Sequence, residues 1–275
     1  MTGGTRVGSV TAKPDLKQLS RLVERDPIVH CFPASRLVPG SPPIPIWGYE
    51  RDGELTSAVF AGLNMVPVET TTQAREEFAS YAAVSPRRPS SIAGRQGEVL
   101  DLWQRIEPFW PPAREVRDSQ PFLVATRQPE LVPDPMVRPV RLTEADELLS
   151  ACVAMFTEEL GVSPLAGHGD IEYRRRVSDL IRQRRVFARF EGSRLVFKAE
   201  LGAVSRSACQ IQGVWVHPEH RGHGLAISGM AAVVQWARQQ VPHVSLYVNE
   251  YNTTALHVYE RAGFTRYDTF ATILF

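Results

Sequence analysis

A glycine-containing turn at residues 217–224 constrains the fold of this chain more than any other segment. An apolar strand pattern at residues 214–216 precedes it, and a helical pattern over residues 222–240 begins within it. Gly222 and Gly224 let the backbone approach a bulky anion without a Cβ in the way. The unpaired N–H groups of the first helical turn and the helix dipole attract that anion. The segment therefore predicts a main-chain cradle for a pyrophosphate.

The rest of the C-terminal half alternates between helical and strand patterns. Apolar residues at helical spacing predict an amphipathic helix over residues 145–160, with Gly161 as its C-cap. A hairpin is expected to turn at residues 191–193, between two apolar runs. Further helices are expected at residues 171–184 and 252–262, and strands lie between them. This order predicts an α/β sheet with helices packed on its faces.

Proline divides the chain into two parts of similar size. Four prolines fall within residues 129–139, and such a run is extended and cannot form a helix interior. The predicted organisation is a disordered tail at 1–20, an N-terminal α/β domain at 21–130, a linker at 131–137 and a C-terminal domain at 138–275. The N-terminal domain also shows a hairpin signal, at Asp52-Gly53, followed by helices. We expect it to be a second α/β domain, which a degenerate copy of the C-terminal fold would explain.

Composition excludes several classes of protein. The 275 residues contain 31 Lys and Arg against 30 Asp and Glu, so the chain lacks the basic excess of a nucleic-acid or anionic-membrane binder. The sequence has no run of about 18 apolar residues and no apolar core of a signal peptide near its start, which predicts a cytoplasmic protein. The three cysteines lie far apart and fit neither a disulfide framework nor a zinc site. Three histidines recur at every third position from His217, but no further ligand completes a set, so no metal is expected.

Two motifs in the C-terminal half resemble those of the GNAT superfamily, the acyl-CoA-dependent N-acyltransferases. The first is Arg/Gln-x-x-Gly-x-Gly/Ala, matched by residues 221–226. The second is a helix with Asn252, Ala255 and Tyr259, followed by Gly263 and Phe264. The resemblance covers about residues 138–275, and the whole chain resembles a bacterial group in which an N-terminal domain of uncertain role precedes such a domain. The implied fold is a mixed, mostly antiparallel sheet flanked by helices.

The resemblance assigns a role to each part of these motifs. It implies that Tyr259 hydrogen-bonds the thioester sulfur and protonates the leaving thiolate, because a phenol stays protonated at neutral pH. An N–H near Val216 would stabilise the charge that develops on the thioester carbonyl oxygen. Acetyl-CoA would be held by the strand residues Val214, Trp215 and Val216, by the loop residues Arg221, Gly222, His223, Gly224, Leu225 and Ala226, and by Asn252 and Ala255.

The general base is harder to assign from the sequence. An ammonium must lose a proton before it can attack, so a carboxylate or a water chain is needed near the thioester. Many members of the family place a glutamate on the central strand, where this chain has Gln210 and Gln212. Glu200 on the neighbouring strand is the first candidate and Glu250 is the second. A base that acts through water, or no base, remains an alternative.

These features together predict an acetyl-CoA-dependent N-acetyltransferase that acts on a primary amine by direct attack in a ternary complex. No cysteine is placed to form an acyl-enzyme. The segment from Phe156 to Tyr173 is expected to border the acceptor, as in relatives. One alternative is an acyl-CoA-binding regulatory module with little turnover, and another is a tandem-domain transferase acting on a protein or peptide amine. The sequence names neither the acceptor nor the oligomeric state, so a homodimer stays open.

Overall fold

The two halves of the chain contain the same elements in the same order. The computed structural model describes residues 8–85, 89–161, 163–165 and 169–275. The first half contains β1 (Ser9–Thr11), α1 (Leu16–Val23), α2 (Cys31–Arg36), β2 (Ile46–Arg51), β3 (Glu54–Ala61), β4 (Asn64–Val68), α3 (Thr72–Val84), β5 (Ser91–Arg95), α4 (Gln96–Ile106) and β6 (Glu115–Ala125). The second contains β7 (Arg138–Pro139), α5 (Ala145–Leu160), α6 (Gly169–Arg182), β8 (Val186–Glu191), β9 (Arg194–Val204), β10 (Ala208–Val216), α7 (Leu225–Arg238), β11 (His243–Tyr247), α8 (Thr253–Arg261) and β12 (Phe264–Leu274). The N-terminal half is therefore a second copy of the C-terminal fold.

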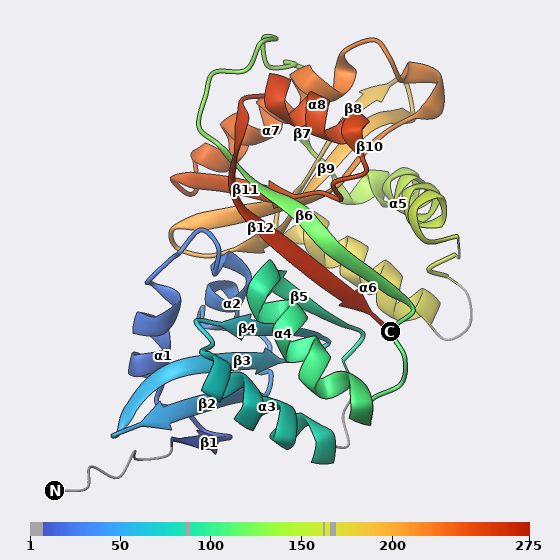
Figure 1. The fold of residues 1–275 in the computed structure, drawn as a ribbon. Coiled ribbons are helices and arrows are strands. Elements are labelled where there is room, and N and C mark those ends of the chain that lie inside the picture. Colours follow the sequence, from blue (N-terminus) through green and yellow to red (C-terminus); the bar gives the residue numbers. More distant parts are fainter. Residues whose placement is uncertain (1–7, 86–88, 162, 166–168) are drawn as a thin grey trace, which may run out of the picture.

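All twelve strands form one continuous sheet (Figure 1). Their order is β1-β2-β3-β4-β5-β12-β6-β11-β10-β9-β8-β7. The pairs β4–β5 and β10–β11 are parallel, and the other pairs are antiparallel. The prediction of a mixed, mostly antiparallel sheet flanked by helices is confirmed.

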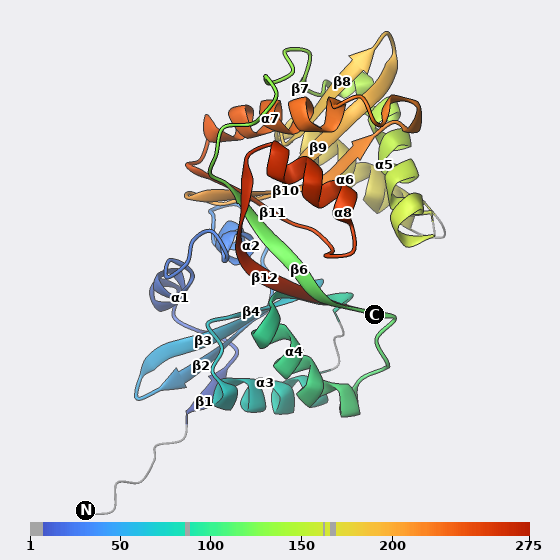
Figure 2. The same cartoon turned by 45° about the horizontal axis from the view of Figure 1, so that its top comes forward.

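The last strand of each half lies in the sheet of the other half. β6 ends the N-terminal half but pairs with β11, at Phe122 to Val124. β12 ends the C-terminal half but pairs with β5, at residues 270–274. These two long strands also pair with each other and cross between the halves (Figure 2). Because of this exchange, the strand pairing runs through both halves and does not stop at the proline-rich segment.

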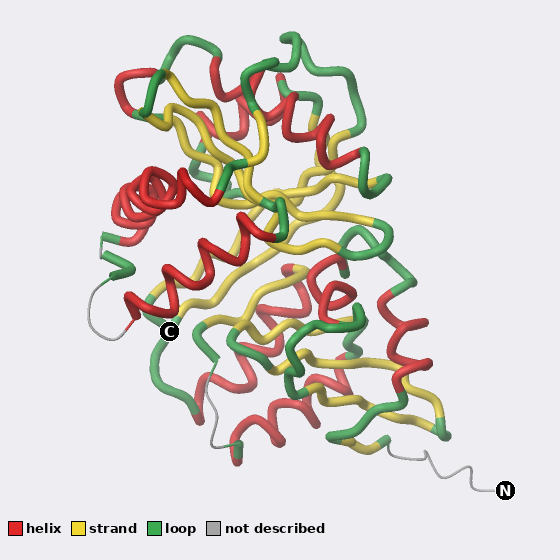
Figure 3. The backbone as a smooth tube through the Cα atoms, turned by 180° about the vertical axis from the view of Figure 1, so that it is seen from behind, coloured by secondary structure: helices red, strands yellow, loops and turns green. Residues whose placement is uncertain are grey.

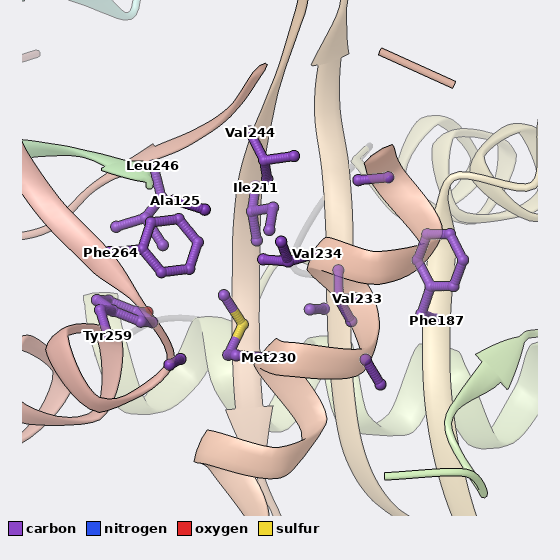
Figure 4. Close-up of a cluster of buried hydrophobic side chains, with 14 of the residues drawn as sticks. Ala125, Phe187, Ile211, Met230, Val233, Val234, Val244, Leu246, Tyr259 and Phe264 are labelled. Atoms are coloured by element: carbon purple, nitrogen blue, oxygen red, sulfur yellow. The ribbon is translucent and has the colours of Figure 1, made fainter. Parts of the chain in front are cut away.

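Helices cover both faces of the sheet in each half. In the C-terminal half, α7 and α8 pack with β9, β10 and β11 into one buried cluster, part of which Figure 4 shows. The helices α5 and α6 pack on the opposite face, which is in front in Figure 3. In the N-terminal half, α3 and α4 form one cluster and α1 and α2 another. Each half therefore has three layers.

Local sequence signals account for most turns and caps. Asp52 and Gly53, both with positive φ, join β2 to β3, as the hairpin signal predicts. The β8–β9 hairpin turns at Gly192, with φ +62°. Gly161 ends α5 with φ +72°, as expected for a C-cap. No helix in the described part of the chain is both long and apolar enough to span a bilayer.

The start of the chain differs from the expected disordered tail. Within residues 1–20, β1 pairs with β2 and forms the edge of the sheet, and α1 begins after Asp15. The Asp15 carboxylate caps α1 by accepting hydrogen bonds from the N–H groups of Lys17 and Gln18. Pairing at a free sheet edge and a helix cap order this polar stretch despite its Gly- and Thr-rich composition. Residues 1–7 lie outside the described part.

Candidate functional site: a gap between parallel strands

The site begins where β10 and β11 separate. These parallel strands pair only from Ala208 to Gln210 on β10. Beyond that point β10 carries a β-bulge between Gln212 and Trp215, with Gly213 at φ +60°. The chain after β11 instead follows β6, where the Val248 N–H donates to the Pro121 carbonyl at 3.2 Å. A gap therefore opens between the ends of two parallel strands.

A buried ion pair contacts the bulge through the Gly213 carbonyl. The Lys198 ammonium is fully buried, and it donates to the Gly213 carbonyl at 3.0 Å and to Glu200 at 2.8 Å. Arg176 also pairs with Glu200, at 3.0 Å. A Cβ at Gly213 would approach both Lys198 and Glu200 to 3.1 Å, so glycine fits both the conformation and the space.

This arrangement does not support the predicted role of Glu200 as the general base. Although burial opposes ionisation, Lys198 and Arg176 lower the pKa of Glu200 to about 2. Its carboxylate is 2% exposed, and both oxygens accept hydrogen bonds from these cations. A carboxylate held in this way has little tendency to take a proton at neutral pH. The other candidate, Glu250, is 55% exposed and lies 4.0 Å from Arg266.

The predicted coenzyme residues gather around one cavity of about 670 Å³. It lies at the open side of the gap, between the end of β10, the start of α7 and the first turns of α8. His223 is within the turn but is not among the lining residues. The predicted residues that line it are Val214, Trp215, Val216, Arg221, Gly222, Gly224, Leu225, Ala226, Asn252, Ala255 and Tyr259.

The turn before α7 presents a row of free main-chain donors. Gly222 and Gly224 have φ of +81° and +76°, and a Cβ at Gly222 would meet open space. Within the described part of the chain, no main-chain carbonyl accepts from the N–H groups of residues 222–226. The α7 helix therefore starts at Leu225, later than the predicted start at Gly222. Several donors at one helix N-terminus form an anion site.

The Arg221 side chain lies across one side of this cavity. Its Nε donates to the Val216 carbonyl at 3.0 Å, and its terminal nitrogen donates to Glu158 at 2.8 Å. The guanidinium is about half exposed. The side chain therefore links the end of β10 to α5 while its charge stays near the free amides.

Tyr259 lies at the inner end of the same cavity. Its ring is 9% exposed and packs beside Phe264, at 6.0 Å between ring centroids (Figure 4). Burial, with a smaller effect from the charge of Glu159, raises the pKa of Tyr259 well above that of a free phenol. The hydroxyl is therefore protonated at neutral pH and can donate a proton.

A smaller cavity of about 270 Å³ adjoins the first at Tyr259. Glu159, near the end of α5, lines both cavities. Its carboxylate is 52% exposed and pairs with Arg117 at 3.2 Å. Arg117 and Gln120 come from β6, so the strand exchange brings N-terminal residues to this site. The sequence analysis did not predict Glu159, Arg117 or Gln120 as site residues. For the two β6 residues there was no signal, because nothing in the sequence shows that β6 pairs with β11. For Glu159 the one signal was its position on the amphipathic helix that precedes the expected acceptor segment.

The segment predicted to border the acceptor is only partly described. Met155, one residue before its start, lines both cavities together with Glu159. The rings of Phe156 and Tyr173 contact each other edge to face at 6.2 Å. Residues 162 and 166–168 of this segment lie outside the described part.

Two known family models match the chain, and their matched regions meet within α5. Residues 155–264 match the model of the acetyltransferase (GNAT) family. Residues 44–148 match the model of a domain of unknown function, DUF4081. No curated protein matches the chain.

Solved structures match over nearly the whole chain. An acetyltransferase of the GNAT family from Colwellia psychrerythraea aligns with a TM-score of 0.60 at 12% identity, covering 97% of this chain and 99% of its own. A tandem GNAT protein from the clavulanic acid biosynthesis pathway aligns at 0.57 and 14% identity, over 96% and 97%. A GCN5-related N-acetyltransferase from Sphaerobacter thermophilus aligns at 0.56 and 17% identity, over 98% and 95%. The chain therefore carries a C-terminal domain of the GNAT acetyltransferase family, preceded by a DUF4081 domain with the same fold.

Proposed function

We propose that the protein is an acetyl-CoA-dependent N-acetyltransferase that acts on a primary amine by direct attack in a ternary complex. The observation that carries this proposal is the row of free N–H groups at residues 222–226, which opens into the same cavity as the Tyr259 hydroxyl. The family match supports acyl transfer in general. Bound acetyl-CoA would supply an acetyl group activated as a thioester.

Successive parts of acetyl-CoA would bind to successive groups along the cavity. The amides of Gly222 to Ala226 would hold the pyrophosphate. The edge of β10 would bind the pantetheine arm as an added strand. His217 N–H donates to Val196 on β9, so the alternation of a strand directs the Val216 N–H towards the gap. There it would stabilise negative charge on the thioester carbonyl oxygen.

Two side chains would move the protons of the reaction. Tyr259 would protonate the departing sulfur, because its raised pKa keeps the hydroxyl in the acid form. Glu159 would accept the proton of the attacking amine, directly or through water, since it is the carboxylate that lines both cavities at Tyr259. Arg117 would hold Glu159 in position.

A covalent acyl-enzyme is not needed for this route. Cys152 is buried and its Sγ lies 3.6 Å from the Glu200 carboxylate. Burial raises its pKa to about 11, and it lines none of the cavities around Tyr259. A thiol of that kind is a poor nucleophile.

Replacement of Tyr259 tests the proposal. Tyr259→Phe keeps the ring packing and removes the acid, so turnover should fall about 100-fold, while the dissociation constant of acetyl-CoA changes little. Release of free thiol from acetyl-CoA measures the first quantity and isothermal titration measures the second. An acyl-CoA-binding regulatory module would bind acetyl-CoA and release no thiol with any amine, in either form of the protein.

A further inference from the structure

A second large cavity, of about 630 Å³, lies between the two halves and has no role in the site described so far. Residues of α2, β4 and β5 line it from the N-terminal half, and residues of α6, β9 and β10 line it from the C-terminal half. It shares Gln210, Gln212 and Tyr247 with the small cavity next to Tyr259. The two cavities therefore adjoin at these three side chains.

One charge in this cavity has no counter-ion. Arg36, at the end of α2, makes no ion pair in the described part of the chain, and its buried Nε has no hydrogen-bond partner there. Its guanidinium lies over the Phe32 ring at 4.7 Å. Burial, and next the charge of Arg185, lower the pKa of Arg36. Arg36 is therefore a half-buried cation that lines the cavity without a paired anion in the described residues.

The other cations of the cavity are already neutralised. Arg95 pairs with Asp26, Glu69 and Asp268 at 2.6 to 2.9 Å. Arg176 pairs with Glu200 at 3.0 Å. The free positive charge is therefore concentrated at the Arg36 end, where an anionic group of a ligand would gain two charge-assisted hydrogen bonds in a bidentate geometry.

The helix α6 gives a length scale for the cavity between the Gln212 side and the end of α6. Arg176 lies beside Gln212, since both side chains bond to Glu200. Gln183 lines the same cavity just beyond the C-terminal end of α6. Seven residues of helix separate Arg176 from Gln183, which is about 10 Å.

We propose that the acceptor is a primary amine that carries a carboxylate about 10 Å from the amine, as a short peptide with a free C-terminus does, and that Arg36 binds this carboxylate. This assignment rests on the proposed function and names the class of its acceptor. The carboxylate would lie at the guanidinium of Arg36. The chain of the acceptor would run along α6, and its amine would pass Gln212 to reach the acetyl group beside Tyr259.

Glycine oligomers of one to four residues test the assignment, each as the free acid and as the C-terminal amide. Three extended residues span about 10 Å, so triglycine is the best probe. With acetyl-CoA and the full chain, the free acid should be acetylated with a kcat/KM at least about tenfold above that of its amide. The preference should be largest near three residues. Equal rates for acid and amide would overturn the carboxylate assignment.

Substitutions test whether Arg36 causes the preference for the free acid over the amide. Arg36→Gln should remove the difference between acid and amide by lowering only the rate with the acid, and Arg36→Lys should keep part of it. Arg175→Gln is the control, because this arginine is on α6, which lines the cavity, but is itself 83% exposed and outside the lining. A melting temperature for each variant shows whether it folds. An undiminished preference in folded Arg36→Gln would also overturn the assignment.

The two proposals fail in different ways. If amines without a carboxylate are acetylated as well as those with one, the acceptor class is wrong and the acetyltransferase stands. If no amine of either kind causes thiol release, although acetyl-CoA binds, the proposed function is wrong and the acceptor class falls with it.

Discussion

The two halves share one fold but differ in the turn that precedes the central helix. In the C-terminal half eight residues, 217–224, connect β10 to α7, and their glycines leave a row of amides free. In the N-terminal half only three residues, 69–71, connect β4 to α3. An identical element order therefore does not produce an identical site.

Acidic and hydroxyl side chains occupy the amides of the shorter turn. Glu98 accepts a hydrogen bond from the Thr70 N–H at 2.7 Å, and the Thr71 hydroxyl accepts from the Ala74 N–H at 3.1 Å. The adjacent Glu69 binds His30 and Arg95. A negative side chain at a helix N-terminus takes the place of a bound anion and repels another. We therefore expect one acetyl-CoA site in each chain.

The strands beside these turns differ in the same way. Counted from the hairpin turn, Lys198 and Glu200 on β9 correspond to Ala58 and Phe60 on β3, and all four are buried. β3 and β4 pair without a bulge, whereas β10 carries one extra residue at Gly213. The C-terminal half thus keeps a costly buried ion pair where its bulge opens the cavity, and the N-terminal half has apolar side chains there.

The largest expected effect comes from breaking this ion pair. Lys198→Met leaves Arg176 as the one cationic partner of Glu200 among the described residues and removes the donor to Gly213, so the free energy of unfolding should fall by about 3–5 kcal/mol. Urea titration measures it, with the exposed Lys17→Met as control. The double variant Lys198→Ala with Glu200→Phe copies the N-terminal half, and it should recover stability but bind acetyl-CoA more weakly. Equal stability of Lys198→Met and the parent would contradict the supporting role.

A negative charge in the glycine turn should have the next largest effect. Gly222→Asp has open space for its side chain, and aspartate tolerates positive φ, so the fold should persist. Its carboxylate would face the pyrophosphate, and we expect acetyl-CoA to bind about 100-fold more weakly by isothermal titration. Gly97→Asp adds a carboxylate to the first turn of α4, another helix N-terminus in the N-terminal half, and should leave the affinity unchanged. A loss of affinity with Gly97→Asp would mean that the N-terminal half also binds the coenzyme.

Arg117 tests whether the exchanged strand contributes to the reaction. Arg117→Gln removes the partner of Glu159 without touching the glycine turn. We expect kcat/KM for the amine to fall about tenfold, since one charged hydrogen bond is worth about 1.5–3 kcal/mol, with acetyl-CoA affinity unchanged. Arg114→Gln, just before β6, is the control. Full activity of Arg117→Gln would confine the site to the C-terminal half.

The smallest expected effects come from replacing the N-cap residues of α3 and α8, which should differ in their effect on acetyl-CoA binding. Thr71→Ala removes the cap of α3 and should cost about 1 kcal/mol of unfolding free energy while acetyl-CoA affinity stays the same. Asn252→Ala removes the cap of α8, with a similar cost. Because Asn252 also lines the coenzyme cavity, its replacement should weaken acetyl-CoA binding several-fold as well. Equal affinities in the two variants would show that Asn252 serves only as a cap.

The amino-acid sequence by itself determined the local features of this protein. Helix periodicity, caps and hairpin turns are encoded within a few residues of each other, so α5, the Asp52-Gly53 turn and the glycine turn before α7 were all predictable. The coenzyme residues lie on two continuous segments for the same reason. They meet around one cavity because both segments follow neighbouring strands.

Only the tertiary structure decided which distant residues share an environment. Glu200 carries a carboxylate, the group that a general base needs, but Lys198 and Arg176 pair with it and hold it ionised. The exchange of β6 and β12 brings Arg117 to Glu159, and the meeting of the halves places Arg36 in a cavity where no anion among the described residues pairs with it. The charge state of a side chain depends on burial and on neighbours many residues away, and these follow from strand pairing, which no local pattern encodes.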